Sequence, residues 1–98
     1  MIRIDILSQT PEEAVMRVAG EVWLDYEIDL VAQEGNRYLE TSKLLVLDLE
    51  HLQRLSDRAL PLLKEWQSAG RLQIRAWHYL LDFKLRHHGL AAKPEGLP

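Results

Sequence analysis

The chain has 98 residues, enough for one domain with a single hydrophobic core. Hydrophobic residues make up 47% and charged residues 28%, the balance of a globular protein and not of a disordered one. The formal net charge of -3 and the scattered Lys and Arg residues argue against a nucleic-acid partner, because DNA and RNA attract clustered basic residues.

The sequence also limits its chemistry and its compartment. It contains no cysteine, which excludes disulfides, thiolate chemistry and cysteine-based metal sites, and which fits a reducing compartment. No run reaches the roughly 18 apolar residues that a membrane-spanning helix needs. Residues 1–3 lead directly into an alternating segment, so we expect no signal peptide. These features predict a cytoplasmic protein that does not insert into a membrane.

Two strands are predicted at the start of the chain. Residues 2–7 alternate between isoleucine and mostly polar side chains, which is typical of a half-buried strand. Residues 8–13 have turn composition, and the apolar segment 14–19 returns as a second strand. We therefore expect an antiparallel hairpin, with Gly20 ending the second strand.

An amphipathic helix is predicted over residues 25–41. Its apolar stripe comprises Ile28, Val31, Ala32, Gly35, Tyr38 and Leu39. Its polar side comprises Glu27, Gln33, Glu34, Arg37 and Glu40. A glycine within a helix costs about 1 kcal/mol relative to alanine, so Gly35 indicates a close approach of this helix to the sheet.

Residues 44–60 are the stretch around which we expect the fold to be organised. The apolar run before Asp48 is typical of a strand that is covered on both faces. A helix is predicted over 57–69, with Pro61 in or just after its first turn and Gly70 at its C-terminal end. Its inward side comprises Leu60, Leu63 and Trp66, flanked by Ala59 and Leu62.

The start of this second helix is the candidate site. The hydroxyl of Ser56 is placed to accept a hydrogen bond from the backbone N–H of Arg58 or Ala59. Helix N-termini at the carboxyl ends of parallel strands often bind ligands or partners in α/β proteins. We therefore place the functional residues at Ser56, Asp57 and Arg58.

The remaining residues complete an α/β fold. Residues 71–76 alternate sharply and predict an edge strand with one solvated face. A last helix is expected over 78–88, ended by Gly89, and residues 91–98 are expected to form a flexible tail after a domain of residues 1–90. The order β-β-α-β-α-β-α predicts a mixed sheet of about four strands with the helices packed mainly on one face.

Several short segments resemble the STAS domain of bacterial anti-sigma factor antagonists. Residues 18–22 resemble the Gly-Glu-Leu strand end of that family, and residues 46–49 resemble its Val-Leu-Asp-Leu strand. Residues 55–60 lie where the family has Ile-Asp-Ser-Ser-Gly-Leu. Residues 70–72 and 89–90 resemble its Gly-Gly-Arg-Leu strand and its terminal Thr-Gly-Leu. The order and spacing of these segments agree with the family from about Val15 to Leu90.

The resemblance implies a non-enzymatic protein that binds a kinase-like anti-sigma factor. In the family this kinase phosphorylates the first serine of Asp-Ser-Ser-Gly and thereby switches binding off. That position is Asp57 here, and the residues around it are Ser56, Arg58 and Ala59. The chain has therefore lost the expected phosphate acceptor. Trp23 replaces an aspartate that often follows Gly-Glu-Leu. Because the sequence stops soon after Leu90, we also expect it to lack the final strand and helix of many family members.

Each of these residues has a structural as well as a functional interpretation. The Asp57 carboxylate either imitates a phosphoserine or interacts favourably with the helix dipole, and we favour the dipole. Ser56 is either a shifted phosphorylation site or an N-cap, and we favour the cap. Trp23 is equally well explained as an interface anchor and as a rim residue folded over the core.

Metal binding and catalysis find little support. His51, His78, His87 and His88 show no pair at the i, i+4 spacing of a helical metal site, so no metal or other cofactor is expected. Asp48 and Glu50 lie two residues apart, and we expect them to be solvated or capping groups and not a catalytic pair.

Three functions remain, in order of preference. The first is a STAS-like module that binds a protein partner, either an anti-sigma factor or a kinase-like ATPase, through Trp23, Ser56, Asp57, Arg58 and Leu60. The second is a STAS subunit that binds the ATPase of an ABC-type phospholipid transporter. The third is a small-molecule-binding or catalytic domain. A homodimer formed through the exposed edge of strand 71–76 is also considered.

Overall fold

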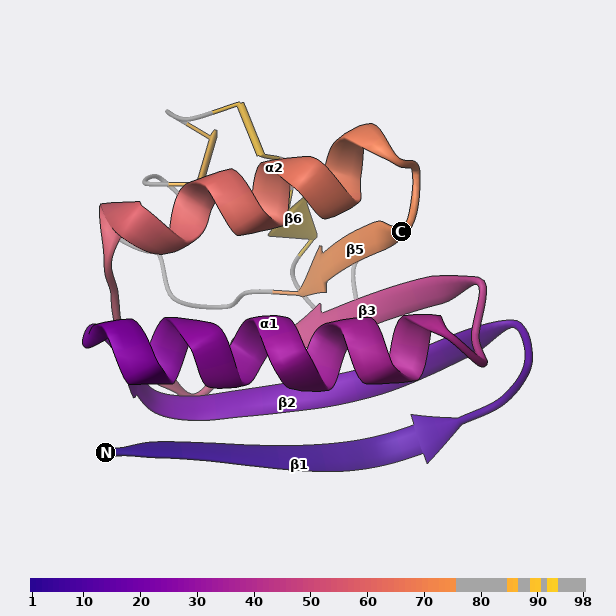
Figure 1. Ribbon diagram of the computed structural model, residues 1–98, viewed down its shortest axis with the longest axis horizontal. Coiled ribbons are helices and arrows are strands. Elements are labelled where there is room, and N and C mark those ends of the chain that lie inside the picture. Colours follow the sequence, from indigo (N-terminus) through magenta and orange to yellow (C-terminus); the bar gives the residue numbers. More distant parts are fainter. Residues whose placement is uncertain (76–84, 87–88, 91, 94–98) are drawn as a thin grey trace.

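The computed structural model describes residues 1–75, 85–86, 89–90 and 92–93 (Figure 1). Its elements in chain order are β1 (Ile2–Gln9), β2 (Glu13–Val22), α1 (Asp25–Leu39), β3 (Leu44–Asp48), β4 (Leu52–Leu55), the short 3-10 helix η1 (Asp57–Ala59), α2 (Leu60–Ser68), β5 (Leu72–Arg75) and β6 (Ala92–Lys93). The fold is mixed α/β, as the sequence predicted.

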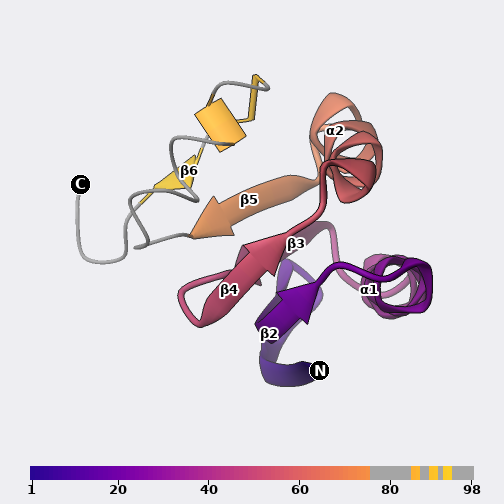
Figure 2. The same ribbon diagram turned by 90° about the vertical axis from the view of Figure 1, so that its left-hand side faces the viewer.

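One sheet joins all the strands in the described part of the chain. Its order is β1-β2-β3-β5-β6, and β4 pairs with β2 off this path. β1 and β2 form the predicted antiparallel hairpin, whereas the other pairings are parallel. β2 is therefore shared: its first half pairs with β3 and its last residues pair with β4. Figure 2 shows β4 beside the end of β2.

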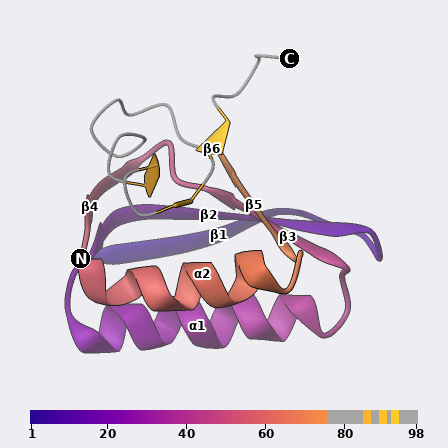
Figure 3. The same cartoon turned by 90° about the horizontal axis from the view of Figure 1, so that it is seen from above.

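The helices α1 and α2 lie side by side on one face of the sheet, as predicted (Figure 3). The core lies between this helical layer and the sheet, because the strands direct alternate apolar side chains toward it. Its members from the strands include Met16, Val18, Leu45, Leu47 and Ile74. The predicted inward residues of the second helix, Leu60, Leu63 and Trp66, are all buried.

Gly35 explains how closely the two helices pack. A Cβ atom at this position would lie 2.3 Å from Cη2 of Trp66 on α2 and 3.2 Å from Cδ2 of Leu45 on β3. The predicted close approach is therefore present, but the nearest surface is the Trp66 indole and not the sheet. The indole Nε1–H also donates to Oδ1 of Asn36 on α1, at 2.9 Å.

The prediction that Gly20 ends the second strand is wrong, because β2 continues to Val22. Gly20 has a φ of +87°, and a Cβ atom there would lie 2.2 Å from the backbone oxygen of Met1. Only glycine accommodates both the left-handed backbone and this contact. The pairing of β2 with β4 shifts register at the same position, so Gly20 marks an irregularity within the strand.

The second helix begins later than predicted. Residues 57–59 form the separate 3-10 turn η1, and the α-helical hydrogen bonding of α2 starts at Leu60 with Pro61 in its first turn. Gly70 follows the helix with a φ of +71°, in the predicted left-handed position.

Two strands were not predicted, and they change the edges of the sheet. β4 fills part of the expected connection between the central strand and the second helix. β6 pairs with Ile74 and Arg75 of β5, so the prediction that segment 71–76 is an edge strand is wrong at these residues. Two residues of the predicted tail therefore belong to the sheet, while the domain boundary at residue 90 stays a prediction.

The predicted helix 78–88 lies mostly outside the described residues, as do Trp77, His78, His87 and His88. Leu85 and Arg86 are described and helical, and Leu85 is buried in the core. Gly89 has a φ of +79°, which agrees with its predicted role as a helix stop.

Candidate functional site: the tip surface

Four segments meet at one end of the molecule, which faces the viewer in Figure 2. They are the end of β2 with the start of α1, the strand β4 and the turn η1. We call their exposed side chains the tip surface: Trp23, Leu24, Tyr26, Arg54, Asp57 and Arg58. Trp23, Asp57 and Arg58 are the members that the sequence predicted.

Arg58 connects η1 to the start of α1. Its guanidinium group donates to Oδ1 of Asp25 at 2.6 Å and to the backbone oxygen of Trp23 at 2.7 Å. Charge-assisted hydrogen bonds of this length are among the stronger polar contacts in proteins, although this pair is solvated and so contributes modestly to stability. Arg58 therefore holds the two segments of the tip surface in a fixed relative position.

Ser56 is buried beneath this contact and acts as the predicted cap. Its Oγ accepts from the backbone N–H of Arg58 at 3.2 Å and from Nε of the same residue at 3.3 Å. Its own backbone N–H donates to the carbonyl oxygen of Val22 at 2.8 Å. The cap stabilises η1 and not the first turn of α2, because the α-helix starts three residues later than expected.

Trp23 and Arg54 pack against each other across the junction of β2 and β4. The guanidinium carbon of Arg54 lies 3.9 Å from the centre of the Trp23 ring, a cation–π contact. Arg54 also donates to Oε2 of Glu21 at 3.0 Å. The indole is thus supported from one side, and 40% of the residue remains exposed.

Leu24 and Tyr26 extend the apolar part of the tip surface. Leu24 is 51% exposed and Tyr26 is 61% exposed, so three large apolar residues near one helix start face the solvent. Sequence reasoning missed these two residues. For Tyr26 the available signal was that it does not fall on the apolar stripe of the predicted helix, which directs its side chain outward. Leu24 precedes the predicted helix, so this pattern gave no signal for it.

Glu27 is buried and stabilises the backbone of the tip surface. The prediction that it lies on the polar side of the helix is therefore wrong. The residue is only 1% exposed. Its Oε1 accepts from the backbone N–H groups of Leu24 at 2.9 Å and Trp23 at 3.1 Å, and its Oε2 lies 3.7 Å from the amino group of Met1. Because Leu24 cannot cap α1 with its side chain, Glu27 satisfies these donors from within the helix.

The same contacts set the ionisation of Glu27. The hydrogen bond from the Leu24 N–H lowers the pKa of this carboxyl group below its ordinary value of 4.5. Burial acts in the opposite direction, and the Trp23 N–H and the positive charge of the Met1 amine lower the pKa further. The group is therefore held as a carboxylate.

Leu60, which we also predicted to bind a partner, lies in the core with 3% of its surface exposed. Its position agrees with the other prediction for it, an inward side chain of the second helix. Asp57 is exposed at the start of η1, as expected for an acidic residue at a helix start. The residues exposed enough to contact a partner directly are thus Trp23, Asp57 and Arg58. The buried residues Ser56 and Leu60 lie on either side of η1 and position it.

Asp48 at the end of β3 and the nearby Glu50 are joined by a backbone contact. Asp48 is buried, and of the two expected roles, a solvated or a capping group, it has the second. Its Oδ2 accepts from Nη2 of Arg17 at 3.1 Å, and its Oδ1 accepts from the backbone N–H of Glu50 at 3.0 Å. Both carboxylate oxygens of Asp48 are thus engaged in structural contacts.

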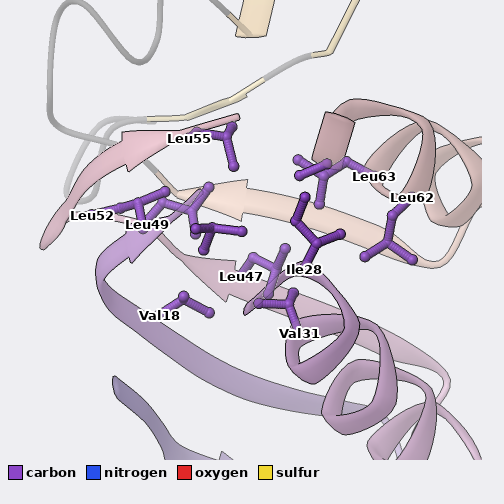
Figure 4. Close-up of a pocket in the computed structure, with 11 residues that line it drawn as sticks. Val18, Ile28, Val31, Leu47, Leu49, Leu52, Leu55, Leu62 and Leu63 are labelled. Carbon is purple, nitrogen blue, oxygen red and sulfur yellow. The ribbon is translucent and has the colours of Figure 1, made fainter. Parts of the chain in front are cut away.

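A small gap in the core lies behind the tip surface, since Val22, Leu55 and Ala59 line it (Figure 4). The remaining lining comes from β2, β3, β4, α1, α2 and Leu49, and in Figure 4 the labelled side chains point toward one another. The gap measures about 10 Å³ and all its lining residues are apolar, including Val18, Ile28 and Leu63. A space this small holds about one water molecule at most, and apolar gaps of this size stay dry.

Within the described ranges, the side chains of His, Asp and Glu form no group of three or more that is suitable for a metal ion. Among the described helices, none has both the length and the apolar character needed to cross a bilayer.

Comparison with known proteins gives a result only at the level of structure. No protein-family model matches the chain, and no curated protein sequence matches it. The anti-sigma factor antagonist SpoIIAA in its unphosphorylated form superposes with a TM-score of 0.68 at 12% identity, over 97% of this chain and 90% of that chain. The phosphorylated form of SpoIIAA, a Bacillus cell fate determinant, superposes with a TM-score of 0.65 at 13% identity, over 95% and 93% of the two chains.

The fold is STAS-like.

This result confirms the fold that the sequence resemblance implied. The likeness extends over nearly the whole of both proteins, so it concerns the complete domain and not one supersecondary unit. At 12–13% identity the likeness supports the STAS-like architecture alone. The roles of individual residues follow from the geometry of this chain.

Proposed function

We propose that this STAS-like domain is a non-enzymatic interaction module that binds a protein partner through the tip surface. The observation that carries the proposal is the group of Trp23, Leu24 and Tyr26, three large apolar residues that are 40–61% exposed at the start of α1. Exposed aromatic residues are enriched among the residues that dominate binding energy at protein interfaces. Single apolar residues at a surface are ordinary, but neighbouring ones on a supported segment favour a binding site.

The fixed conformation of this surface also supports the proposal. Arg58 links η1 to Asp25 and Trp23, and Glu27 fixes the backbone on which Trp23 and Leu24 are carried. A partner that binds a surface already held in position loses little conformational entropy. Ser56 and Leu60 contribute from below, as cap and as core anchor of the turn.

We further propose that binding is not switched by serine phosphorylation at the position used in the resembling family. Asp57 stands at that position, and a carboxylate reproduces only part of the charge and of the hydrogen-bonding capacity of a phosphate. The neighbouring Ser56 hydroxyl is buried and accepts two hydrogen bonds from Arg58. A kinase would have to break these contacts before it could reach Ser56.

The carboxylates near the tip surface and the apolar core gap support a non-enzymatic function. Asp48 of β3 and Glu27 of α1 are engaged by Arg17 and by backbone N–H groups, and the core gap behind the tip surface has no polar lining. SpoIIAA, which shares the fold, is described as an anti-sigma factor antagonist. Our first candidate for the partner is therefore an anti-sigma factor or a kinase-like ATPase.

Affinity capture with matched variants tests the proposal. The tagged protein is expressed in its native cell, and co-purifying proteins are quantified by mass spectrometry. Leu24→Ala and Tyr26→Ala should each reduce capture of the specific partner at least about tenfold. Leu7→Ala is the control, because Leu7 is 47% exposed, close to the 51% of Leu24, but lies near the far end of β1.

The possible outcomes separate the candidate functions. An anti-sigma factor or kinase-like ATPase lost from both tip variants supports the proposal, whereas an ABC transporter ATPase supports the transport subunit. A partner retained by both tip variants contradicts the tip surface as its binding site. Capture of a metabolite without a protein contradicts an interaction module. Incubation with a kinase from the same cell and labelled ATP tests the switch, since phosphate on Ser56 contradicts its loss.

A further inference from the structure

The strand β1 has an open edge that matches a second copy of itself. Within the described residues it pairs with β2 alone, and it lies at the end of the sheet. Open strand edges invite pairing with another chain, and natural proteins commonly protect them with charges or bulges. β1 carries both devices, but its charges are arranged so that two copies of the strand attract each other.

The backbone groups that point outward belong to the three isoleucines of β1. The N–H of Glu21 on β2 donates to the carbonyl oxygen of Met1 at 3.0 Å. In an antiparallel pair the residues alternate between those that bond to the neighbour and those that point away from it. Given the register that opposes Ile2 to Gly20, the N–H and C=O groups of Ile2, Ile4 and Ile6 therefore face the open side.

The side chains of Arg3 and Asp5 select one register. They form an exposed ion pair on the same face of the strand, at 2.9 Å, with side chains 77% and 40% exposed. A two-fold axis through Ile4 places Arg3 of each copy opposite Asp5 of the other. An axis through Arg3 opposes two arginines, and an axis through Asp5 opposes two aspartates. Opposite charges that face each other across strands stabilise the pairing, and like charges oppose it.

The same register satisfies the backbone and the apolar side chains. With the axis through Ile4, this residue faces its own copy and Ile2 faces Ile6. The outward-facing N–H and C=O groups of all three isoleucines therefore find partners. Their side chains already pack partly against the core from the helical side of the sheet. The irregularity between Ile6 and Ser8 ends the straight part of the strand, which confines the pairing to residues 2–6.

We propose that two copies of this chain associate through an antiparallel pairing of their β1 strands, centred on Ile4, which joins two sheets into one. The pairing leaves α1 and α2 of both copies on the same face, because a two-fold axis perpendicular to a sheet preserves its faces. The tip surface is not part of this contact, so the proposal is independent of the proposed function. A short edge is a small interface, and we expect a dissociation constant in the micromolar range.

A charge-exchange experiment tests the register. Sedimentation equilibrium from micromolar to millimolar protein should show a monomer–dimer equilibrium for the unmodified chain. Arg3→Asp and Asp5→Arg each place like charges opposite one another, and each should weaken association at least about tenfold. An equimolar mixture of the two variants restores both opposite-charge contacts, and should associate within about threefold of the unmodified chain.

Matched controls make the result specific. Lys43→Asp and Glu12→Arg introduce the same charge changes in another exposed ion pair, which joins Lys43 Nζ to Glu12 Oε2 at 3.5 Å. Both should associate like the unmodified chain. The proposal is overturned if the unmodified chain stays monomeric at millimolar concentration, or if the variants of β1 associate as strongly as these controls.

A single cysteine gives a second and independent measurement. The chain has no native cysteine, and Ile4 is the residue that lies on the proposed axis. Two copies of Cys at this position would have Cα atoms about 5.5 Å apart, within the range that a disulfide requires. Ile4→Cys should therefore form a disulfide dimer under mild oxidation, and Ile2→Cys should not. Equal cross-linking of both variants, or of neither, contradicts the register.

Discussion

The two ends of the helical layer hold together in different ways. Where α1 and α2 pack closely, Gly35 leaves space for the Trp66 indole, and both residues are buried in hydrocarbon contacts. At the tip surface, Arg58 and Glu27 fix the backbone through hydrogen bonds and ion pairs, while Trp23 and Tyr26 remain exposed. Apolar burial therefore stabilises the first region, and polar contacts keep apolar side chains available in the second.

Replacement of Trp66 should cause the largest loss of stability. Trp66→Ala removes a buried indole that packs on α1 at Gly35 and Asn36, and truncation of a buried tryptophan typically costs about 3–5 kcal/mol. Chemical denaturation should show this as a fall in the free energy of unfolding. A loss below 1 kcal/mol would contradict a packing role, because such values are usual for surface substitutions.

Gly35→Ala should have the next largest effect. The added Cβ would lie 2.3 Å from Cη2 of Trp66, so one of the helices must shift, and overpacking of this kind costs about 1–3 kcal/mol. The loss should shrink when Trp66 is already replaced by leucine, which a double-mutant cycle measures directly. Additive losses would mean that the two residues do not interact.

Glu27→Gln should change how stability depends on pH more than it changes the fold. The folded pKa of Glu27 lies below its ordinary value of 4.5, so the unfolded chain binds more protons on acidification. The stabilisation is fully present above pH 4.5 and is lost as the pH falls through the folded pKa. The free energy of unfolding of Glu27→Gln should therefore fall less between neutral pH and pH 3 than that of the unmodified protein, because the glutamine does not titrate. Parallel pH profiles would contradict this assignment.

Tyr26→Ala should have the smallest effect on stability. The side chain is 61% exposed at the start of α1, and substitutions at such positions usually change the free energy of unfolding within about 0.5 kcal/mol. The same variant is expected to lose its partner, so stability and binding should separate. A large destabilisation would place Tyr26 with the packed region instead of the tip surface.

Local patterns in the sequence were enough to predict most of the fold. The alternation of residues 2–7, the apolar run before Asp48 and the two helical stripes are properties of neighbouring residues, and the elements that they predict are present. Gly35 could be interpreted as well, since a glycine on an apolar helix stripe indicates a close neighbour. Which neighbour it meets depends on the approach of α2, and no local pattern contains that information.

The features that were missed depend on contacts between distant segments. β4 has only four residues, and it is a strand because the end of β2 offers it backbone partners. β6 is shorter still and depends on β5 in the same way. Glu27 follows the polar pattern of its helix, but the N–H groups of Trp23 and Leu24 make its burial favourable. Arg58 likewise finds Asp25 at a separation of 33 residues.

The division of β2 between two neighbours has a mechanical consequence. Because β3 pairs with Glu13–Arg17 and β4 pairs with Gly20–Val22, the hydrogen bonds of β4 can open while the ladder between β2 and β3 stays intact. Gly20, with its left-handed backbone, lies where the part of β2 that pairs with β4 begins. A partner that pulls on Trp23 and Arg54 therefore loads the short pairing of β4 before it loads the ladder between β2 and β3.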